Sequence, residues 1–223
     1  MTDQPGGVIW DLDGTLVDTA ELHFQAWSAL TGQLDRPFSR GEFAATFGQR
    51  NPEILAALFG QRFTAQEVAE LGDRKEEFYR AAAEKGVDLL PGGRTLLAGL
   101  KAAGFQQAIG SSAPRANIDL ILRLTQTASF FDALVSEGDT QRGKPDPQVF
   151  LIAAHKLGLD PRRCVVIEDA PAGVQAAKAG GMKCIAVSFV GHHSHETLRK
   201  AGADRVVPSL EQVSPSTFHE LLS

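Results

Sequence analysis

Short apolar runs alternate with helical patterns along most of this chain, and the alternation limits what it can fold into. The runs cover residues 8–12, 105–110, 133–136, 164–167, 184–187 and 205–207. Short apolar runs bounded by turn residues are typical of buried strands. Strands that alternate with helices form βαβ units, which make a parallel sheet covered on both faces. We therefore predict an α/β fold with a doubly wound parallel sheet.

The stretch from about residue 19 to residue 85 departs from this alternation because its whole pattern is helical. Apolar residues in Ala20–Leu30 follow helical spacing. Asn51-Pro52-Glu53 predicts a helix start with Asn51 as the cap. Thr64-Ala65-Gln66-Glu67 matches a capping box that opens a long helix toward Lys85.

This helical stretch separates the first strand from the rest of the sheet, so it is predicted to be an insertion. We predict a core domain made of residues 1–18 and 87–223, with a helical cap domain at residues 19–86. Joints near residues 17–19 and 84–90 would let the cap move against the core.

Composition excludes several classes of function. The net charge is -5 and no basic run occurs, so we expect no nucleic-acid partner. The apolar stretches are far shorter than the ~18 residues that cross a membrane. The polar start at residues 1–5 is unlike a signal peptide, so we expect a cytoplasmic protein, as a monomer or weak oligomer. Cys164 and Cys184 lie in apolar runs and are expected to be buried, unpaired strand residues.

Two carboxylates, Asp11 and Asp13, stand at the end of the first apolar run, and Gly14 comes directly after them. The period of two along a strand predicts that both side chains start on the same side. Crowded carboxylates repel each other unless a cation lies between them or they share a proton. Gly14 permits a sharp turn of the backbone. This pattern indicates chemistry rather than structure.

Polar side chains also follow the later strands. They are Ser111 and Ser112, Lys144 in the loop Gly143–Pro147, and Glu168 with Asp169. Taken singly, each has an ordinary structural explanation as a helix cap, a loop residue or a solvated charge. Because the carboxyl ends of parallel strands meet at one crevice, their joint occurrence favours an active site there.

The chemistry of these groups suits phosphoryl transfer. Asp11, Asp169 and Glu168 offer the oxygen ligands that Mg²⁺ prefers. One carboxylate could attack an electrophile, and phosphorus is favoured over carbon because Ser111 and Lys144 can hold phosphoryl oxygens. Asp13 would then serve as the general acid and base.

The chain resembles the haloacid dehalogenase superfamily in all four of its motifs. These are Asp11–Asp18, Ser111, Lys144–Pro147 and Glu168-Asp169. The resemblance implies a Rossmann-like core, a Mg²⁺ cofactor and an aspartyl-phosphate intermediate. It makes Asp11 the nucleophile and a metal ligand, and Asp13 the acid/base that also offers a backbone carbonyl to the metal. It makes Asp169 a metal ligand and Glu168 a direct or water-mediated one. Ser111 and Lys144 would bind the transferred phosphoryl group.

The insertion resembles that of β-phosphoglucomutase and its sugar-phosphatase relatives. His23, within Asp18–Trp27, falls where the mutase has a hinge histidine. Lys75 matches its cap lysine, and Arg50 lies near its phosphate-binding arginine. These matches imply that His23, Arg50 and Lys75 contact the substrate.

One departure bears on the reaction. Where the mutase has Ala-Ser-Lys-Asn after the motif serine, this chain has Ser112-Ala113-Pro114-Arg115. Ser112 and Arg115 are then the predicted phosphate contacts, with Arg115 the one cation that could replace the lysine. We therefore predict a Mg²⁺-dependent phosphatase of small phosphorylated sugars. The alternatives are a β-phosphoglucomutase, an inert binding protein with the same fold, and a phosphonate hydrolase that uses a cap lysine.

The remaining motif is a histidine tract, His192-His193-Ser194-His195. A polar loop is the expected structure, because the carboxylates of the other motifs already account for the metal. The sequence assigns no role to the three histidines.

Overall fold

The computed structural model describes residues 6–223, and residues 1–5, where no signal peptide was predicted, lie outside the described residues. Six parallel strands form one sheet in the order β3-β2-β1-β4-β5-β6. The strands are β1 (Gly7–Trp10), β2 (Gln106–Gly110), β3 (Ala133–Val135), β4 (Cys164–Glu168), β5 (Lys183–Val187) and β6 (Arg205–Val207). The predicted α/β fold with a parallel sheet is confirmed.

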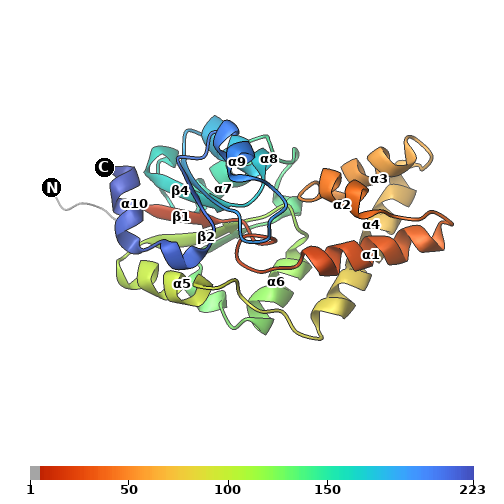
Figure 1. The fold of residues 1–223 in the computed structure, drawn as a ribbon, viewed down its shortest axis with the longest axis horizontal. Coiled ribbons are helices and arrows are strands. Elements are labelled where there is room, and N and C mark those ends of the chain that lie inside the picture. Colours follow the sequence, from red (N-terminus) through yellow and green to blue (C-terminus); the bar gives the residue numbers. More distant parts are fainter. Residues whose placement is uncertain (1–5) are drawn as a thin grey trace.

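Helices cover both faces of the sheet (Figure 1). Val8 and Trp10 of β1 pack into one core cluster, against α5 (Gly93–Ala102), α6 (Arg115–Leu124) and α10 (Pro215–Leu222). Ile9 points to the opposite cluster, formed with α7 (Gln148–Lys156), α8 (Pro171–Ala179) and α9 (His195–Lys200). This alternation follows from the period of two along a strand that is buried on both faces.

Short 3₁₀ turns complete the connections of the core. They are η1 (Ala128–Phe130), η2 (Glu137–Asp139), η3 (Pro161–Arg163) and η4 (Leu210–Gln212). Cys164 and Cys184 are both buried and unpaired, as the sequence predicted.

Four helices and no strand lie between β1 and α5. They are α1 (Ala20–Gln33), α2 (Arg40–Thr46), α3 (Asn51–Phe59) and α4 (Ala65–Ala83). They extend to the right of the sheet in Figure 1 and enclose a small apolar cluster of their own, formed by Trp27, Leu30, Ile54 and Leu55. We call residues 19–86 the helical insertion; its division from the core as a separate domain stays a prediction.

Two details of the insertion test the predicted helix starts. The Thr64 hydroxyl accepts from the Glu67 N–H, which confirms the capping box of α4. The predicted cap at Asn51 is wrong, because α3 already begins at Asn51 with Arg50 as its N-cap. The Asn51 amide instead donates to Glu76 of α4, at 2.9 Å. The side chain that the local pattern predicted to cap a helix is therefore used in a tertiary contact.

The strand β1 ends at Trp10, one residue before the carboxylates. The Asp11 N–H still donates to the Ile167 carbonyl, but the chain then turns through Gly14, whose φ is +85°. The regular strand therefore ends before Asp13, and both Asp11 and Asp13 line the same cavity. Asp11 and Asp13 have different partners, described below.

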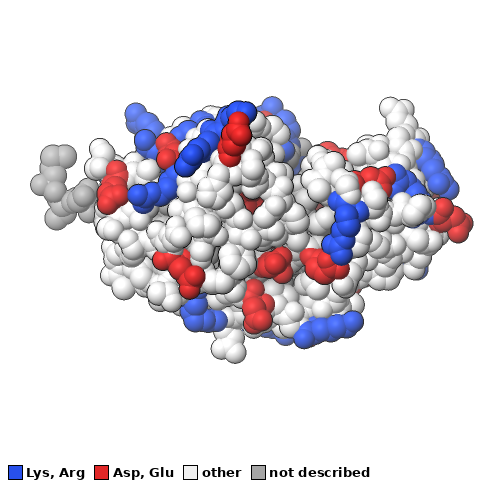
Figure 2. Space-filling model, viewed as in Figure 1, with Lys and Arg blue, Asp and Glu red and all other residues white. Residues whose placement is uncertain are grey.

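The surface carries mixed charge. Basic and acidic side chains are interspersed on the face shown in Figure 2. Among residues 6–223, no helix is both long enough and apolar enough to cross a membrane.

Candidate active site

A cavity of about 250 Å³ lies between the carboxyl edge of the sheet and the helical insertion. This volume is below the roughly 300–1,000 Å³ of pockets for drug-sized ligands, so the cavity suits a small metabolite. Ten predicted site residues line it: Asp11, Asp13, His23, Arg50, Lys75, Ser111, Ser112, Lys144, Glu168 and Asp169. Arg115 does not.

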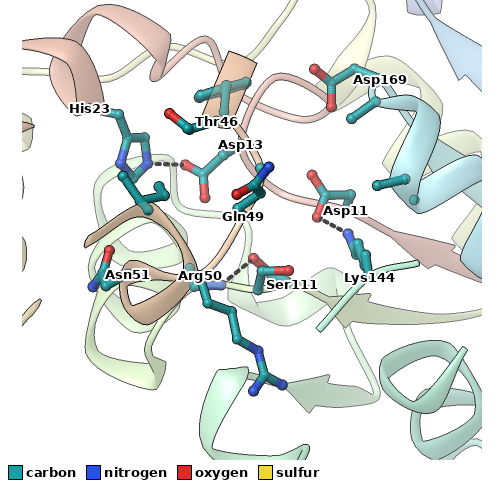
Figure 3. A pocket seen from close by; sticks show the side chains of 18 of the residues that line it. Asp11, Asp13, His23, Thr46, Gln49, Arg50, Asn51, Ser111, Lys144 and Asp169 are labelled. Carbon is teal, nitrogen blue, oxygen red and sulfur yellow. Dashed lines mark hydrogen bonds and ion pairs between the residues drawn. The ribbon is translucent and has the colours of Figure 1, made fainter. Parts of the chain in front are cut away.

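Lys144 lies between two acids at the base of the cavity. Its Nζ is 2.6 Å from Asp11 Oδ1 and 2.7 Å from Glu168 Oε1 (the Asp11 contact is drawn in Figure 3). The other Glu168 oxygen accepts from the backbone N–H groups of Asp169 and Ala170. Burial alone would lower the pKa of Lys144, but the two carboxylates outweigh it and raise the pKa above its usual value. Lys144 is therefore held as a cation beside Asp11.

Three buried carboxylates cluster around this lysine. Oxygens of Asp11, Glu168 and Asp169 all lie within 4.8 Å of one another. Burial, together with repulsion among the acids, raises the pKa of Asp11 to about 7 and that of Asp169 well above its usual value. A single ammonium cannot neutralise three carboxylates, and unneutralised charge is costly when buried. The excess negative charge and the hard oxygen donors fit a divalent cation such as Mg²⁺.

Two glycines let the backbone approach these acids closely. A Cβ at Gly14 would lie 2.3 Å from Asp169 Oδ2, and Gly14 also has a positive φ. A Cβ at Gly173 would lie 1.7 Å from Glu168 Oε1. Neither position accepts a side chain without moving a carboxylate of the cluster.

We predict that Gly173→Ala lowers the free energy of unfolding by about 1–3 kcal/mol, the usual cost of overpacking. Glu168 must move, so if the acid cluster holds Mg²⁺, any rise in melting temperature caused by Mg²⁺ should be smaller in the variant. Urea unfolding and thermal melts with and without Mg²⁺ measure both effects. Gly32→Ala is the control, since a Cβ there has nothing within 4 Å. Equal stability of the two variants would contradict the close packing at Gly173.

Asp13 is held by donors that all reach the same oxygen. Its Oδ1 accepts from Thr19 Oγ1 at 2.5 Å and Tyr79 OH at 3.2 Å, and it lies 3.3 Å from His23 Nε2. His23 in turn stacks on Tyr79, with 4.2 Å between ring centroids. Burial would raise the pKa of Asp13, but His23 and Thr19 outweigh it and lower the pKa to about 2. Asp13 is therefore an anion in the ligand-free site.

Lys75 fixes the orientation of His23. The buried Lys75 Nζ lies 2.7 Å from His23 Nδ1 and 2.9 Å from Glu76 Oε1. An ammonium group can only donate, so His23 Nδ1 must accept, and the ring proton is on Nε2, facing Asp13. Figure 3 shows His23 directed at Asp13. The insertion thus reaches Asp13, the second carboxylate of the first motif.

Glu76 is a buried member of this network that the sequence did not single out. It accepts from Asn117 of α6 at 2.6 Å, so it links the insertion to the core. A glutamate inside a helix is usually exposed, and the local pattern gives no sign that this one is buried.

The other predicted contacts differ in where they point. Ser111 is buried, and its Oγ accepts from the Ala113 N–H at 3.0 Å. The Arg50 guanidinium donates to Thr140 and to the Gln141 carbonyl, on the loop before Lys144. Arg115 pairs instead with Asp119 at 2.8 Å, and both side chains are more than half exposed. The structure therefore does not bring Arg115 together with the other predicted phosphate contacts.

The histidine tract lies beside the insertion. His193 lines the cavity, and the His192 ring is 5.0 Å from that of Phe47. Burial lowers the pKa of both histidines. His195 Nε2 is 2.8 Å from Ser188 Oγ, outside the cavity lining. Sequence reasoning missed the place of His193 at the cavity because the loop is adjacent to the insertion only in the folded chain.

Comparison with known proteins places this geometry in a family. The family described as haloacid dehalogenase-like hydrolase matches residues 8–187, a span that holds all the motif residues. The chain belongs to this family. It is 36% identical over 220 residues to the beta-phosphoglucomutase of Bacillus subtilis (strain 168), covering 96% of this chain and 93% of that one. It is 30% identical over 192 residues to fructose-1-phosphate phosphatase YqaB of Escherichia coli (strain K12), covering 85% and 100%.

A solved structure agrees along the whole length. The beta-phosphoglucomutase of Clostridium difficile superposes with a TM-score of 0.88 at 26% identity, covering 98% of this chain and 97% of that chain. The relatives are named as phosphatases and phosphoglucomutases. This haloacid dehalogenase-like protein is therefore a phosphoryl-transfer enzyme, with a sugar phosphatase or phosphoglucomutase-like function.

Proposed function

We propose that this enzyme is a Mg²⁺-dependent phosphatase of small phosphorylated sugars that acts through an aspartyl-phosphate intermediate. One observation carries the choice of hydrolysis: of the predicted cations beyond the acid cluster, Arg115 and Lys75 pair with carboxylates, and Arg50 donates to neutral groups of the core. Arg115 pairs with Asp119, Arg50 binds the loop at 140–141, and Lys75 pairs with Glu76. A mutase must hold a bisphosphate, whose second phosphate needs cationic partners. A phosphatase needs only to admit water.

The first half-reaction starts at Asp11. One Asp11 oxygen attacks phosphorus, the bond from phosphorus to the sugar oxygen breaks, and Asp13 supplies the proton to that oxygen. Lys144 and Ser111 bind the phosphoryl oxygens and offset their charge. Asp11, Asp169 and Glu168 would hold Mg²⁺, which would supply further positive charge beside the phosphoryl group.

Asp13 can donate a proton only if its pKa rises from about 2. A phosphoryl dianion entering the site disfavours the Asp13 anion and so raises its pKa. After the sugar leaves, the Asp13 carboxylate takes a proton from water, and the water oxygen attacks the phosphorus on Asp11. The bond from phosphorus to Asp11 breaks and free phosphate leaves.

β-Phosphoglucomutase is the second candidate, favoured by the 36% identity to a mutase over 96% of the chain. A phosphometabolite panel with Mg²⁺ distinguishes the two, if it includes β-glucose 1-phosphate with and without catalytic glucose 1,6-bisphosphate. Release of free phosphate from sugar monophosphates supports the phosphatase. Glucose 6-phosphate as the product overturns it in favour of the mutase.

Two further candidates have weaker support. An inert binding protein predicts no Mg²⁺-dependent hydrolysis of p-nitrophenyl phosphate, which is a direct assay. A phosphonate hydrolase needs a cap lysine free to form a Schiff base, whereas the Lys75 ammonium is held by Glu76 and His23.

Removal of metal is expected to abolish hydrolysis, and added Mg²⁺ should restore it. The pKa of Asp11 is raised to about 7, so protons compete with Mg²⁺ for this carboxylate. The pKa of Asp169 is raised as well, so the apparent Mg²⁺ affinity should rise with pH as these carboxylates lose their protons. Calorimetric titration of the chelated enzyme between pH 5.5 and 8.5 measures this dependence. A pH-independent affinity, or full activity after chelation, would contradict the metal assignment.

A further inference from the structure

Glu137 presents a carboxylate to the cavity without a partner. It lies in η2, directly after β3, and its side chain is half-buried in the cavity lining. Within residues 6–223, no hydrogen bond or ion pair reaches its carboxylate. An acceptor that loses water without gaining a donor costs free energy, so this group is available for a donor from a ligand.

The backbone around Glu137 is fixed. Its N–H donates to the Ala113 carbonyl at 3.0 Å, in the loop that follows Ser111. Asp139 accepts from both the N–H and the hydroxyl of Ser136, which closes the turn. The carboxylate therefore projects from a well-defined point beside the Ser111 loop.

The charges around Glu137 show which end of the cavity it faces. Burial raises its pKa, Arg50 lowers it, and the acids Glu76 and Glu53 raise it further. These three residues belong to the helical insertion, and Arg50 also donates to Thr140, whose N–H donates to the Glu137 carbonyl. Glu137 thus faces the insertion end of the cavity, where the sugar would lie if phosphorus is at Asp11.

We propose that Glu137 is a specificity-determining residue that accepts hydrogen bonds from hydroxyl groups of the substrate's sugar. The proposal rests on the proposed function, because it places the phosphoryl group at Asp11. An ionised carboxylate is an acceptor with two oxygens, and the hydroxyls of a neutral sugar are matching donors. Its charge also repels a second phosphate, so Glu137 favours monophosphates over bisphosphates.

The test compares two substrates in Glu137→Gln and Glu137→Leu. For the sugar monophosphate best hydrolysed by the wild type, kcat/KM should fall at least about tenfold in Glu137→Leu, mainly through KM, with a smaller fall in Glu137→Gln. For p-nitrophenyl phosphate, which has no sugar hydroxyl, kcat/KM should stay within about twofold. Glu53→Gln is the control, because it removes a nearby exposed charge outside the cavity. It should leave kcat/KM unchanged for both substrates.

A binding experiment separates this proposal from the proposed function. In the Asp11→Asn background, Glu137→Leu should weaken sugar monophosphate binding about tenfold or more and leave inorganic phosphate binding unchanged. Equal loss for both ligands, no loss for either, or selection of a cationic amino sugar over a neutral one would overturn the role of Glu137. If the wild type hydrolyses no phosphomonoester, the proposed function fails, and the binding result still decides the role of Glu137.

Discussion

Asp11→Asn is expected to lower kcat for phosphomonoester hydrolysis by at least about 10⁴-fold, the range seen when a nucleophile is removed. The amide of asparagine has the same shape as the carboxylate but does not attack phosphorus. Its oxygen can still accept from Lys144, which lies 2.6 Å from Asp11 Oδ1. Steady-state release of phosphate from the panel substrates measures the loss.

Two further measurements show that the loss reflects chemistry rather than folding. The melting temperature of Asp11→Asn should stay close to that of the wild type, because the replacement also relieves repulsion within the buried acid cluster. Brief reaction with ³²P-labelled substrate should label the wild type and leave the variant unlabelled. Near-normal turnover or labelling of the variant would show that another group attacks phosphorus.

Asp13→Asn is expected to lower kcat by about 10²–10⁴-fold, the usual contribution of a general acid or base. Both half-reactions should be slower, but a substrate whose leaving group needs no proton separates the two effects. p-Nitrophenolate leaves without a proton, so p-nitrophenyl phosphate should still phosphorylate the variant. The second step has no base to activate water, so the variant should release one equivalent of p-nitrophenol in a burst and then stall. Stopped-flow absorbance records that burst.

Thr19→Val serves as the matched control for Asp13. It removes one of the donors to Asp13 Oδ1 and keeps the carboxylate, so its effect on kcat should be much smaller. Phosphoenzyme that clears from Asp13→Asn at the wild-type rate would refute the acid/base role of Asp13.

Local pattern was sufficient for the sheet and for most of the site. The apolar runs that predict six strands are the strands of the structure, with ends that differ by at most two residues. Apolar runs predict these strands because each strand buries both of its faces and is therefore composed mostly of apolar residues. Parallel strands then bring their carboxyl ends together, so Lys144 and Glu168 meet Asp11 although they are far apart in sequence.

The local sequence pattern did not predict which partners some polar side chains would have. Arg115 was predicted to bind phosphate, but Asp119 lies one helical turn away and pairs with it on the surface. Asn51 was predicted to cap a helix, but Glu76 takes its amide. For Asn51 the packing of α3 against α4 selected the partner, whereas Arg115 pairs with an exposed neighbour on its own helix.

The sequence by itself determined the order of strands and helices, the family motifs and the type of chemistry, because each depends on residues close together in the chain or on the rules of parallel sheets. The tertiary structure alone decided what surrounds those motifs. It turned Asp13 toward His23 and Tyr79, buried Glu76 against Asn117, and left Glu137 without a partner in the cavity wall. The contacts of Asp13 with Tyr79 and of Glu76 with Asn117 join the helical insertion to the core across long sequence separations, and their geometry exists only once the two parts are packed together.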